Sequence, residues 1–183
     1  MILTETPLPG VFEIAATPHR DDRGAFARLY CPKVFADHGI DFTSTQINLS
    51  TNTRTHTLRG LHFQAPPHAE AKLVRCIKGQ VWDVAVDLRP GPTQGHWHAV
   101  TLDAARMNGV FLPEGVAHGF LTLTEGAEVL YQMGRPYVPG QAKGIRWDDP
   151  DLAITWPAPP ATLSEADAAW PPWREVLPEL RAT

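Results

Sequence analysis

Cysteine is scarce in this sequence, which has only Cys31 and Cys76 among its 183 residues. Two cysteines allow at most one disulfide, so a framework of several disulfides is excluded. A single bridge between them stays open. The two positions are far apart in the sequence and lie in strand-like surroundings, and we expect two reduced, buried thiols in a cytosolic protein.

Long apolar runs are also absent. No uncharged apolar run approaches the ~20 residues that a membrane-spanning helix needs. The first residues, Met1–Pro7, show neither the basic region nor the long apolar core of a signal peptide. We therefore expect a cytoplasmic location and no membrane partner.

Charge of one sign is not in large excess. Sixteen Lys and Arg residues against 20 Asp and Glu residues give a net charge of -4, and the pI is near 6.0. This balance gives no general attraction to nucleic acid or to acidic membranes. A phosphate-bearing small molecule remains possible, because it needs only a local cluster of basic residues.

Signals for long helices are few, and the 18 prolines argue against them. The chain consists mainly of short alternating or β-branched runs, separated by Gly, Pro, Asn and Asp. About ten such runs at a spacing of roughly 8–12 residues indicate an all-β sandwich, barrel or jelly roll. We expect short helices only at Cys31–His38 and Ser164–Ala169. The expected strands are Val11–Ala15, Ala25–Tyr30, Ser44–Ser50, Thr57–Phe63, Ala71–Ile77, Val81–Leu88, His96–Leu102, Gly109–Leu112, Phe120–Leu123 and Glu128–Gln132.

The length suits one domain, which we expect to span residues 1–183. The tail, residues 157–183, is rich in Pro and Ala but keeps Trp170 and Trp173. Such aromatic residues indicate a tail that packs on the body or on a partner subunit.

The densest group of chemically active residues is the run Leu58–Gln64, followed by Lys72–Arg75. Strand alternation would place Arg59 with Leu61 and Phe63 on one face, and His62 with Gln64 on the other. Alternation in the second run places Lys72 with Val74. Each of these polar residues alone is compatible with a buried position whose hydrogen bonds are made within the core. Together on paired strands, they indicate a cavity.

A second group, Pro113–His118, has the spacing Pro-x-Gly-x-x-His of the second half-motif of the cupin barrel. Metal-binding cupins supply two histidines as His-x-His in the first half-motif, whereas here Gln64 replaces the second one. His62, Glu70 and His118 still offer the three ligands of a catalytic metal site, so metal binding remains an alternative. Because Lys72 would lie beside such a metal, we favour a site without metal.

Tyr131 lies in the run Glu128–Gln132, where alternation puts it on the same face as Val129. A tyrosine inside a barrel is usually a core aromatic residue. It becomes a candidate general acid only where it faces a base across a substrate.

The chain resembles the dTDP-4-dehydrorhamnose 3,5-epimerases, a family of metal-free cupins that act on nucleotide sugars. The resemblance runs in family order from about residue 20 to 170 and is highly specific. Its segments are Asp22–Phe26, Gln46–Asn48, Leu58–Gln64, Lys72–Cys76, Asp83–Asp87, Pro113–Phe120, Glu128–Tyr131, Trp147–Pro150 and Leu163–Asp167. It implies a double-stranded β-helix, the cupin or jelly-roll barrel, with short helices and a C-terminal tail.

The resemblance implies epimerisation at C3, C5 or both of a nucleotide-diphosphate 4-keto-6-deoxyhexose, with no cofactor. Such a reaction needs a base on one face of the sugar and an acid on the other. By resemblance His62 is the base, Asp167 orients it, and Tyr131 is the opposing acid. Lys72 would stabilise the enolate oxygen at C4.

The remaining binding residues also follow from the resemblance. Arg59 and Arg23 are implied as contacts of the diphosphate or nucleotide, where a guanidinium bonds well. Gln46 and Asn48 match positions near the sugar and nucleotide, and His118 matches a cavity histidine.

Three positions differ from the family pattern. Arg28 stands near the nucleotide base where the family commonly has Glu, Ile47 replaces an Asp, and Ala166 replaces a Lys. Arg28 reverses a charge at a substrate-binding position. dTDP is the expected nucleotide, but CDP, GDP and UDP stay open.

The resemblance also implies a homodimer that exchanges N-terminal strands, within residues 1–20, and packs sheets face to face. The apolar strand Val11–Ala15 supports this weakly, because it would need a partner edge. Alternatives are a ketoisomerase or an epimerase specific for C3 or C5. A metal-dependent cupin oxygenase and a non-catalytic sugar-nucleotide-binding cupin complete the set.

Overall fold

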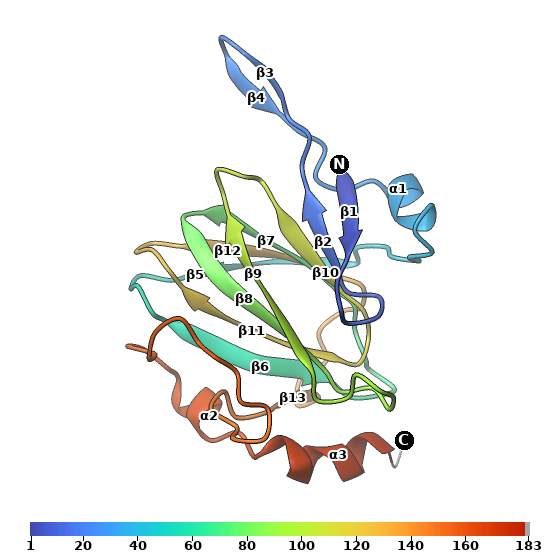
Figure 1. Ribbon diagram of the computed structural model, residues 1–183, viewed down its shortest axis with the longest axis vertical. Helices are drawn as coiled ribbons and strands as arrows, with labels where there is room; N and C mark the ends of the chain where they lie inside the picture. The colour runs from blue at the N-terminus through green and yellow to red at the C-terminus, as the bar shows by residue number, and fades with distance from the viewer. Residues whose placement is uncertain (182–183) are drawn as a thin grey trace.

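Two antiparallel sheets make up most of the computed structural model, which describes residues 1–181 (Figure 1). The six-stranded sheet has the order β1 (Ile2–Glu5), β2 (Phe12–Ala15), β10 (Gly109–Leu112), β7 (Lys72–Lys78), β12 (Glu128–Met133) and β5 (Gln46–Thr51). The five-stranded sheet has the order β13 (Ala142–Gly144), β6 (Leu58–Gln64), β11 (Val116–Thr122), β8 (Gln80–Asp87) and β9 (Trp97–Asp103). Neighbours in each sheet are often distant in sequence, as in a jelly roll. The predicted all-β, double-stranded β-helix of the cupins is confirmed.

The main core lies between the two sheets, where the apolar face of each strand is buried against the opposite sheet. β7 contributes Val74 and Cys76, and β12 contributes Val129, with Tyr131 packed at the margin. Val129 and Tyr131 therefore share a face, as alternation predicted. Val81, Ala85, Leu102 and Phe120 come from the five-stranded sheet.

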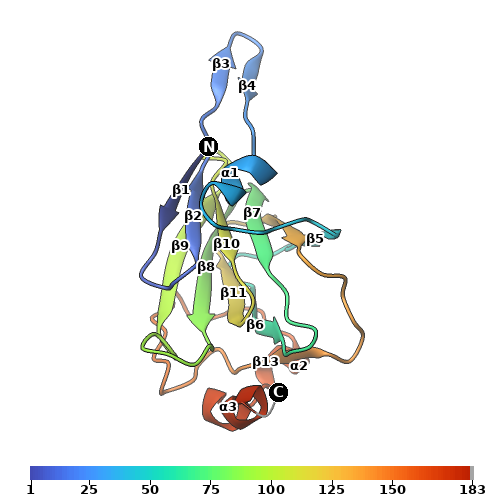
Figure 2. The same cartoon turned by 90° about the vertical axis from the view of Figure 1, so that its right-hand side faces the viewer.

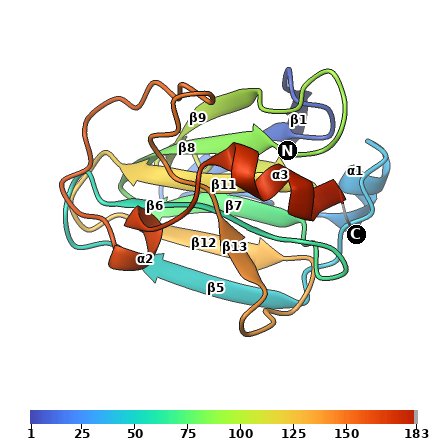
Figure 3. The same cartoon turned by 90° about the horizontal axis from the view of Figure 1, so that it is seen from below.

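The C-terminal segment covers the outer face of the five-stranded sheet (Figure 3). It contains two helices, α2 (Glu165–Ala168) and α3 (Trp173–Arg181). Val176 of α3 packs with Leu61 and Val84, and several tryptophans surround this second cluster. The tail thus packs on the body, as its aromatic residues predicted. α3 was not predicted, because prolines precede it and Pro178 lies within it.

The N-terminal part differs most from the prediction. A hairpin of β3 (His19–Asp21) and β4 (Gly24–Phe26) projects away from the barrel (Figure 2). It is followed by the short helix α1 (Pro32–Ala36). The strand expected at Ala25–Tyr30 ends at Phe26, and β1, β3 and β13 were not predicted.

Two further corrections concern this region. The strand β2 already pairs with β1 on one side and β10 on the other, so it does not need an edge from another subunit. Cys31 and Cys76 are both free, but only Cys76 is buried, because Cys31 lies half-exposed before α1.

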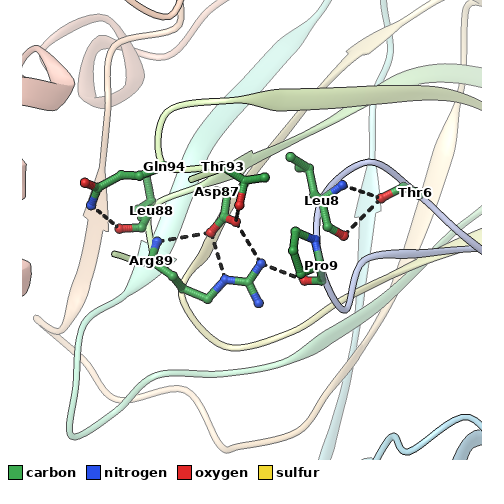
Figure 4. A network of polar contacts seen from close by, with 8 residues as sticks. All are labelled: Thr6, Leu8, Pro9, Asp87, Leu88, Arg89, Thr93 and Gln94. Atoms are coloured by element: carbon green, nitrogen blue, oxygen red, sulfur yellow. Dashed lines mark hydrogen bonds and ion pairs between the residues drawn. The ribbon is translucent and has the colours of Figure 1, made fainter. Parts of the chain in front are cut away.

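A polar network joins the turn after β8 to the N-terminal segment (Figure 4). Arg89 binds the buried carboxylate of Asp87 through Nε at 2.7 Å and Nη2 at 2.9 Å, and Nη2 also donates to the carbonyl of Pro9 at 2.7 Å. Thr93 donates to the same carboxylate at 2.7 Å. Burial alone would raise the pKa of Asp87, but these bonds outweigh it and hold the pKa below its usual value.

Helices of a length and apolarity that would suit a membrane crossing do not occur within residues 1–181.

Candidate active site

A pocket of about 340 Å³ opens between the sheets and is lined by strands of both. Its floor and walls combine charged, polar and aromatic side chains in a barrel whose core is otherwise apolar. The pocket residues are Asn48, Arg59, His62, Phe63, Gln64, Glu70, Lys72, His118, Tyr131, Met133, Tyr137, Ala142, Ala166, Asp167 and Trp170. Seven of the ten residues predicted for the site are among them.

His62 and Asp167 form a close pair, with 2.5 Å between Nε2 and Oδ1. β6 carries the histidine, and α2 brings the carboxylate from the C-terminal segment. Ser164 caps α2 by accepting a hydrogen bond from the backbone N–H of Asp167 at 3.0 Å. Burial would raise the pKa of Asp167, but the hydrogen bond and charge of His62 outweigh it and lower that pKa. The carboxylate is therefore ionised at neutral pH, and it fixes the imidazole tautomer with the proton on Nε2.

Lys72 lies on β7, in the sheet opposite His62. Its Nζ is 3.2 Å from Oε1 of Glu70 and donates to the backbone carbonyl of His62 at 3.3 Å. Only 7% of the lysine side chain is exposed. Burial lowers the pKa of Lys72, while the charges of Glu70 and Asp83 oppose that effect. A cation held this way at the pocket wall is suited to bind a developing oxyanion.

Tyr131 lies on β12, also in the sheet opposite His62. Its ring meets that of His118 edge to face, with 5.8 Å between centroids. His118 Nε2 is 2.8 Å from Oδ2 of Asp83, and both members of this second pair are buried. Burial, reinforced by the charge of Asp83, raises the pKa of Tyr131 far above its usual value. The phenol is therefore protonated at neutral pH.

The position of Arg59 differs from the prediction, which placed it on the face of β6 opposite His62. Arg59 lines the pocket together with His62, whereas Leu61 packs in the outer cluster. The pairing of β6 with β11 shifts register between His118 and Phe120, so alternation along β6 is broken there. Nε of Arg59 donates to the Oδ1 of Asn52 at 2.8 Å, which holds the guanidinium at the pocket rim.

Gln46 and Asn48 lie on β5, at the edge of the six-stranded sheet. Asn48 lines the pocket, and Nε2 of Gln46 donates to Oδ1 of Asn48 at 2.9 Å. Gln46 does not line the pocket, but its Oε1 accepts the backbone N–H of Tyr137 at 3.0 Å. It thereby positions the loop that carries Tyr137 at the pocket mouth.

The structure does not bring Arg23 and Arg28 to this pocket. Arg23 lies in the projecting hairpin (Figure 2), where its side chain is 90% exposed and pairs with Asp21 at 2.5 Å. Arg28 follows the hairpin and lies near Met1 and Val34.

The three residues of the alternative metal site, His62, Glu70 and His118, are bound to other side chains. Glu70 binds Lys72, and its Oε2 accepts a hydrogen bond from Nε2 of Gln64 at 2.5 Å. Within the described residues 1–181, no three His, Cys, Asp or Glu side chains gather in a way that could hold a metal ion.

The sequence reasoning missed Met133 and Tyr137 of the pocket lining, and it missed Asp83 and Trp170, which contact predicted site residues. Asp83 lies in a segment that resembles the family. It shares the apolar inward face of β8 with Ala85, two residues along the same strand, and a carboxylate at such a position indicates a buried polar partner. Trp170, whose indole contacts both Asp167 and His62, was expected only to pack the tail on the body, because a proline-rich tail without periodicity does not show that it reaches the pocket.

The barrel and its pocket, in which a histidine of one sheet pairs with a carboxylate of the C-terminal segment and a tyrosine comes from the other sheet, define a cupin-fold epimerase. A family model described as dTDP-4-dehydrorhamnose 3,5-epimerase matches residues 5–175. The chain belongs to this family, and its enzymatic class is that of the isomerases.

Individual relatives agree with the family match. The dTDP-4-dehydrorhamnose 3,5-epimerase of Salmonella typhimurium is 41% identical over 93% of this chain and 94% of its own length. A dTDP-4-dehydrorhamnose 3-epimerase of Streptomyces niveus is 38% identical over 91% of this chain and 81% of its own. Among solved structures, the epimerase of Legionella pneumophila in complex with dTDP-4-keto-L-rhamnose superposes with a TM-score of 0.92. It is 34% identical, over 98% of this chain and 96% of that one.

Proposed function

We propose that the protein converts dTDP-4-dehydro-6-deoxy-D-glucose to dTDP-4-dehydro-L-rhamnose by inverting C3 and C5. The observation that carries this proposal is the arrangement of the pocket. His62 comes from the five-stranded sheet, and Tyr131 and Lys72 come from the six-stranded sheet. A sugar bound between the sheets would have a base on one face and an acid on the other.

The 4-keto group acidifies the protons on C3 and C5. His62 removes one of these protons, and Asp167 stabilises the imidazolium that forms. The electron pair of the broken C–H bond becomes an enolate with its negative charge on the C4 oxygen. Lys72 stabilises that oxygen as an oxyanion hole does.

Tyr131 then delivers a proton to the carbanion carbon from the opposite face. Its raised pKa keeps the phenol protonated until this step. The phenolate regains a proton from solvent and His62 releases one to solvent, so the pocket returns to its starting state. These proton transfers use side chains alone, and we propose that the reaction needs no cofactor.

Arg59, Asn48 and His118 are the proposed substrate-binding residues of the same pocket. Arg59 at the rim offers its guanidinium to the diphosphate, where planar donors match phosphate oxygens. Asn48 lies nearby on β5, and His118 closes the inner wall beside Tyr131.

We further propose a homodimer in which the β3–β4 hairpin completes the nucleotide site of the second copy. The hairpin carries Arg23, precedes Arg28 and leaves Phe26 78% exposed. The outer face of the six-stranded sheet also exposes apolar side chains, with Ile47 at 61% and Leu49 at 53%. Both features are expected of surfaces that a second copy buries.

Complementation tests this dimer. Co-expressed His62→Ala and Arg23→Ala chains form mixed dimers in which the site that retains His62 receives an intact hairpin from the partner subunit. We expect activity above that of either variant alone, and light scattering at the mass of a dimer. A monomer in solution, or no gain in the mixture, would contradict the proposal.

Three broader statements belong to the same proposal. The whole chain, residues 1–183, acts as one epimerase domain, which agrees with the family match over residues 5–175 and with Asp167 coming from the tail. The free Cys31 and Cys76 agree with a reducing cytoplasm. dTDP is the preferred nucleotide, and a binding comparison with CDP, GDP and UDP tests this at Arg28.

A C3-specific epimerase is the second candidate, because the relative from Streptomyces niveus is named a 3-epimerase. Deuterium incorporation from heavy water distinguishes the two, since only a 3,5-epimerase labels both carbons. His62→Ala should lose exchange at both positions, whereas His96→Ala, on an exposed loop, should keep it. No exchange at either carbon in the unmodified protein would reject both candidates.

A further inference from the structure

Trp170 contacts both members of the His62–Asp167 pair. Its indole Nε1–H donates to Oδ1 of Asp167 at 3.2 Å, the same oxygen that lies 2.5 Å from Nε2 of His62. The indole and imidazole rings also meet edge to face, with 6.3 Å between centroids and an interplanar angle of 74°. One carboxylate oxygen thus accepts two N–H groups from two aromatic rings.

The indole packs against β13 beside His62. In the pairing of β13 with β6, Gly144 is the direct neighbour of His62. A Cβ on Gly144 would lie 2.3–2.4 Å from atoms of the indole, so the ring rests directly on the backbone of β13. The carbonyl of Pro171, the residue after Trp170, accepts the backbone N–H of Arg146 at 3.0 Å. This hydrogen bond holds the segment that carries Trp170 at the end of β13.

Two donors on one oxygen restrict the carboxylate more than a single donor does. The second hydrogen bond fixes the rotation of the carboxylate and takes up part of its charge. Both effects act on His62, because Asp167 sets the orientation and the proton affinity of the imidazole.

We infer that Trp170 is a positioning residue for the epimerase reaction, which holds Asp167 in line with His62 through its indole N–H. This inference rests on the proposed function, in which His62 is the base. Trp170 acts through Asp167 and does not itself transfer a proton.

The test compares Trp170→Phe with Trp173→Phe in the exchange of C3 and C5 protons with heavy water across pH. Both variants replace an indole of the tail by a phenyl ring, but Nε1 of Trp173 is buried without a hydrogen-bond partner. We expect Trp170→Phe to lower kcat about tenfold, the lower end for a hydrogen bond to a charged group. Without the indole donor the carboxylate stabilises the imidazolium more strongly. The acid limb of kcat should therefore move to higher pH.

Gly144→Ala provides an independent variant that keeps the tryptophan. The φ angle of Gly144 lies outside the left-handed region, so the backbone tolerates alanine there, yet the new methyl group displaces the indole. It should reproduce the shift of the acid limb, and Trp173→Phe should not. A purely structural role for Trp170 would lower the melting temperature without moving that limb.

A double-mutant cycle with Asp167→Asn decides whether the effect passes through the carboxylate. In a chain that already carries Asp167→Asn, the further change Trp170→Phe should cost little additional activity. An undiminished loss there, or unchanged kcat and pH profile in Trp170→Phe alone, would overturn the inference. Absence of exchange in the unmodified protein would instead overturn the proposed function.

Discussion

Replacement of Asp167 by Asn tests the histidine–carboxylate pair most directly. The change removes a charge but hardly alters shape. The cap of α2 is retained, because Ser164 accepts the backbone N–H of residue 167 and not its side chain. We expect the variant to fold and to bind substrate, and to fail in proton abstraction.

The magnitude follows from the contact between Oδ1 of Asp167 and Nε2 of His62, at 2.5 Å. A hydrogen bond between charged groups contributes about 1.5–3 kcal/mol, a factor of about 10–150 in rate. An amide N–H facing Nε2 also reverses the tautomer and places the proton on Nδ1, so the ring can no longer accept one there. Asn in place of Asp in a hydrolase triad costs about 10⁴ for this reason. We therefore expect exchange at C3 and C5 to fall about 10³–10⁴-fold.

The assay follows the loss of the C3 and C5 proton signals of dTDP-4-keto-6-deoxyglucose in heavy water by NMR. Asp148→Asn is the matched control, because Asp148 is 40% exposed and pairs with Arg146 outside the pocket. Exchange by Asp167→Asn within tenfold of the unmodified rate would refute the role of the pair.

Three other changes extend the test. Lys72→Met removes the proposed stabiliser of the enolate and should lower exchange about 10²–10³-fold in the same assay; a loss below tenfold would exclude this role. Asp83→Asn removes a negative charge that raises the pKa of both Lys72 and Tyr131. The basic limb of kcat should therefore move to lower pH, and an upward shift would contradict the electrostatics. Arg89→Ala should lower the free energy of unfolding by about 2 kcal/mol at pH 7, measured with urea. The depressed pKa of Asp87 stabilises the fold above pH ~4, and this contribution is lost as pH falls below that value. The difference between Arg89→Ala and the unmodified protein should accordingly shrink in acid, and a difference independent of pH would argue against the ion pair.

Most of the long strands were predictable from runs of six to eight residues, but β11 (Val116–Thr122) was expected only at Phe120–Leu123, because every residue of the strand is buried and no alternation marks where it begins. β6, β7, β8 and β12 were each expected within two residues of their observed ends. The three-residue strands β3 and β13 are too short to show a period, and they exist because neighbouring backbone is available for pairing.

The pocket was predictable to the extent that its residues lie on regular strands. His62, Lys72 and Tyr131 follow alternation, whereas Arg59 does not, because the register shift depends on how β6 meets β11. Asp167 was assigned only through family resemblance, since no local pattern connects the tail with β6.

The hairpin residues show another limit. Arg23 and Arg28 were expected in the pocket through resemblance, yet within one chain the hairpin points away from it (Figure 1). A sequence motif identifies a residue type but does not say which copy of the chain uses it.

The 105 residues that separate His62 from Asp167 have a consequence for how the enzyme becomes active. During synthesis the ribosome delivers all strands of both sheets before it reaches α2. A nascent barrel therefore contains His62 without the carboxylate of Asp167. In the finished molecule, local opening of the tail alone would silence the enzyme, so hydrogen-exchange protection around Asp167 should follow activity more closely than protection of the barrel does.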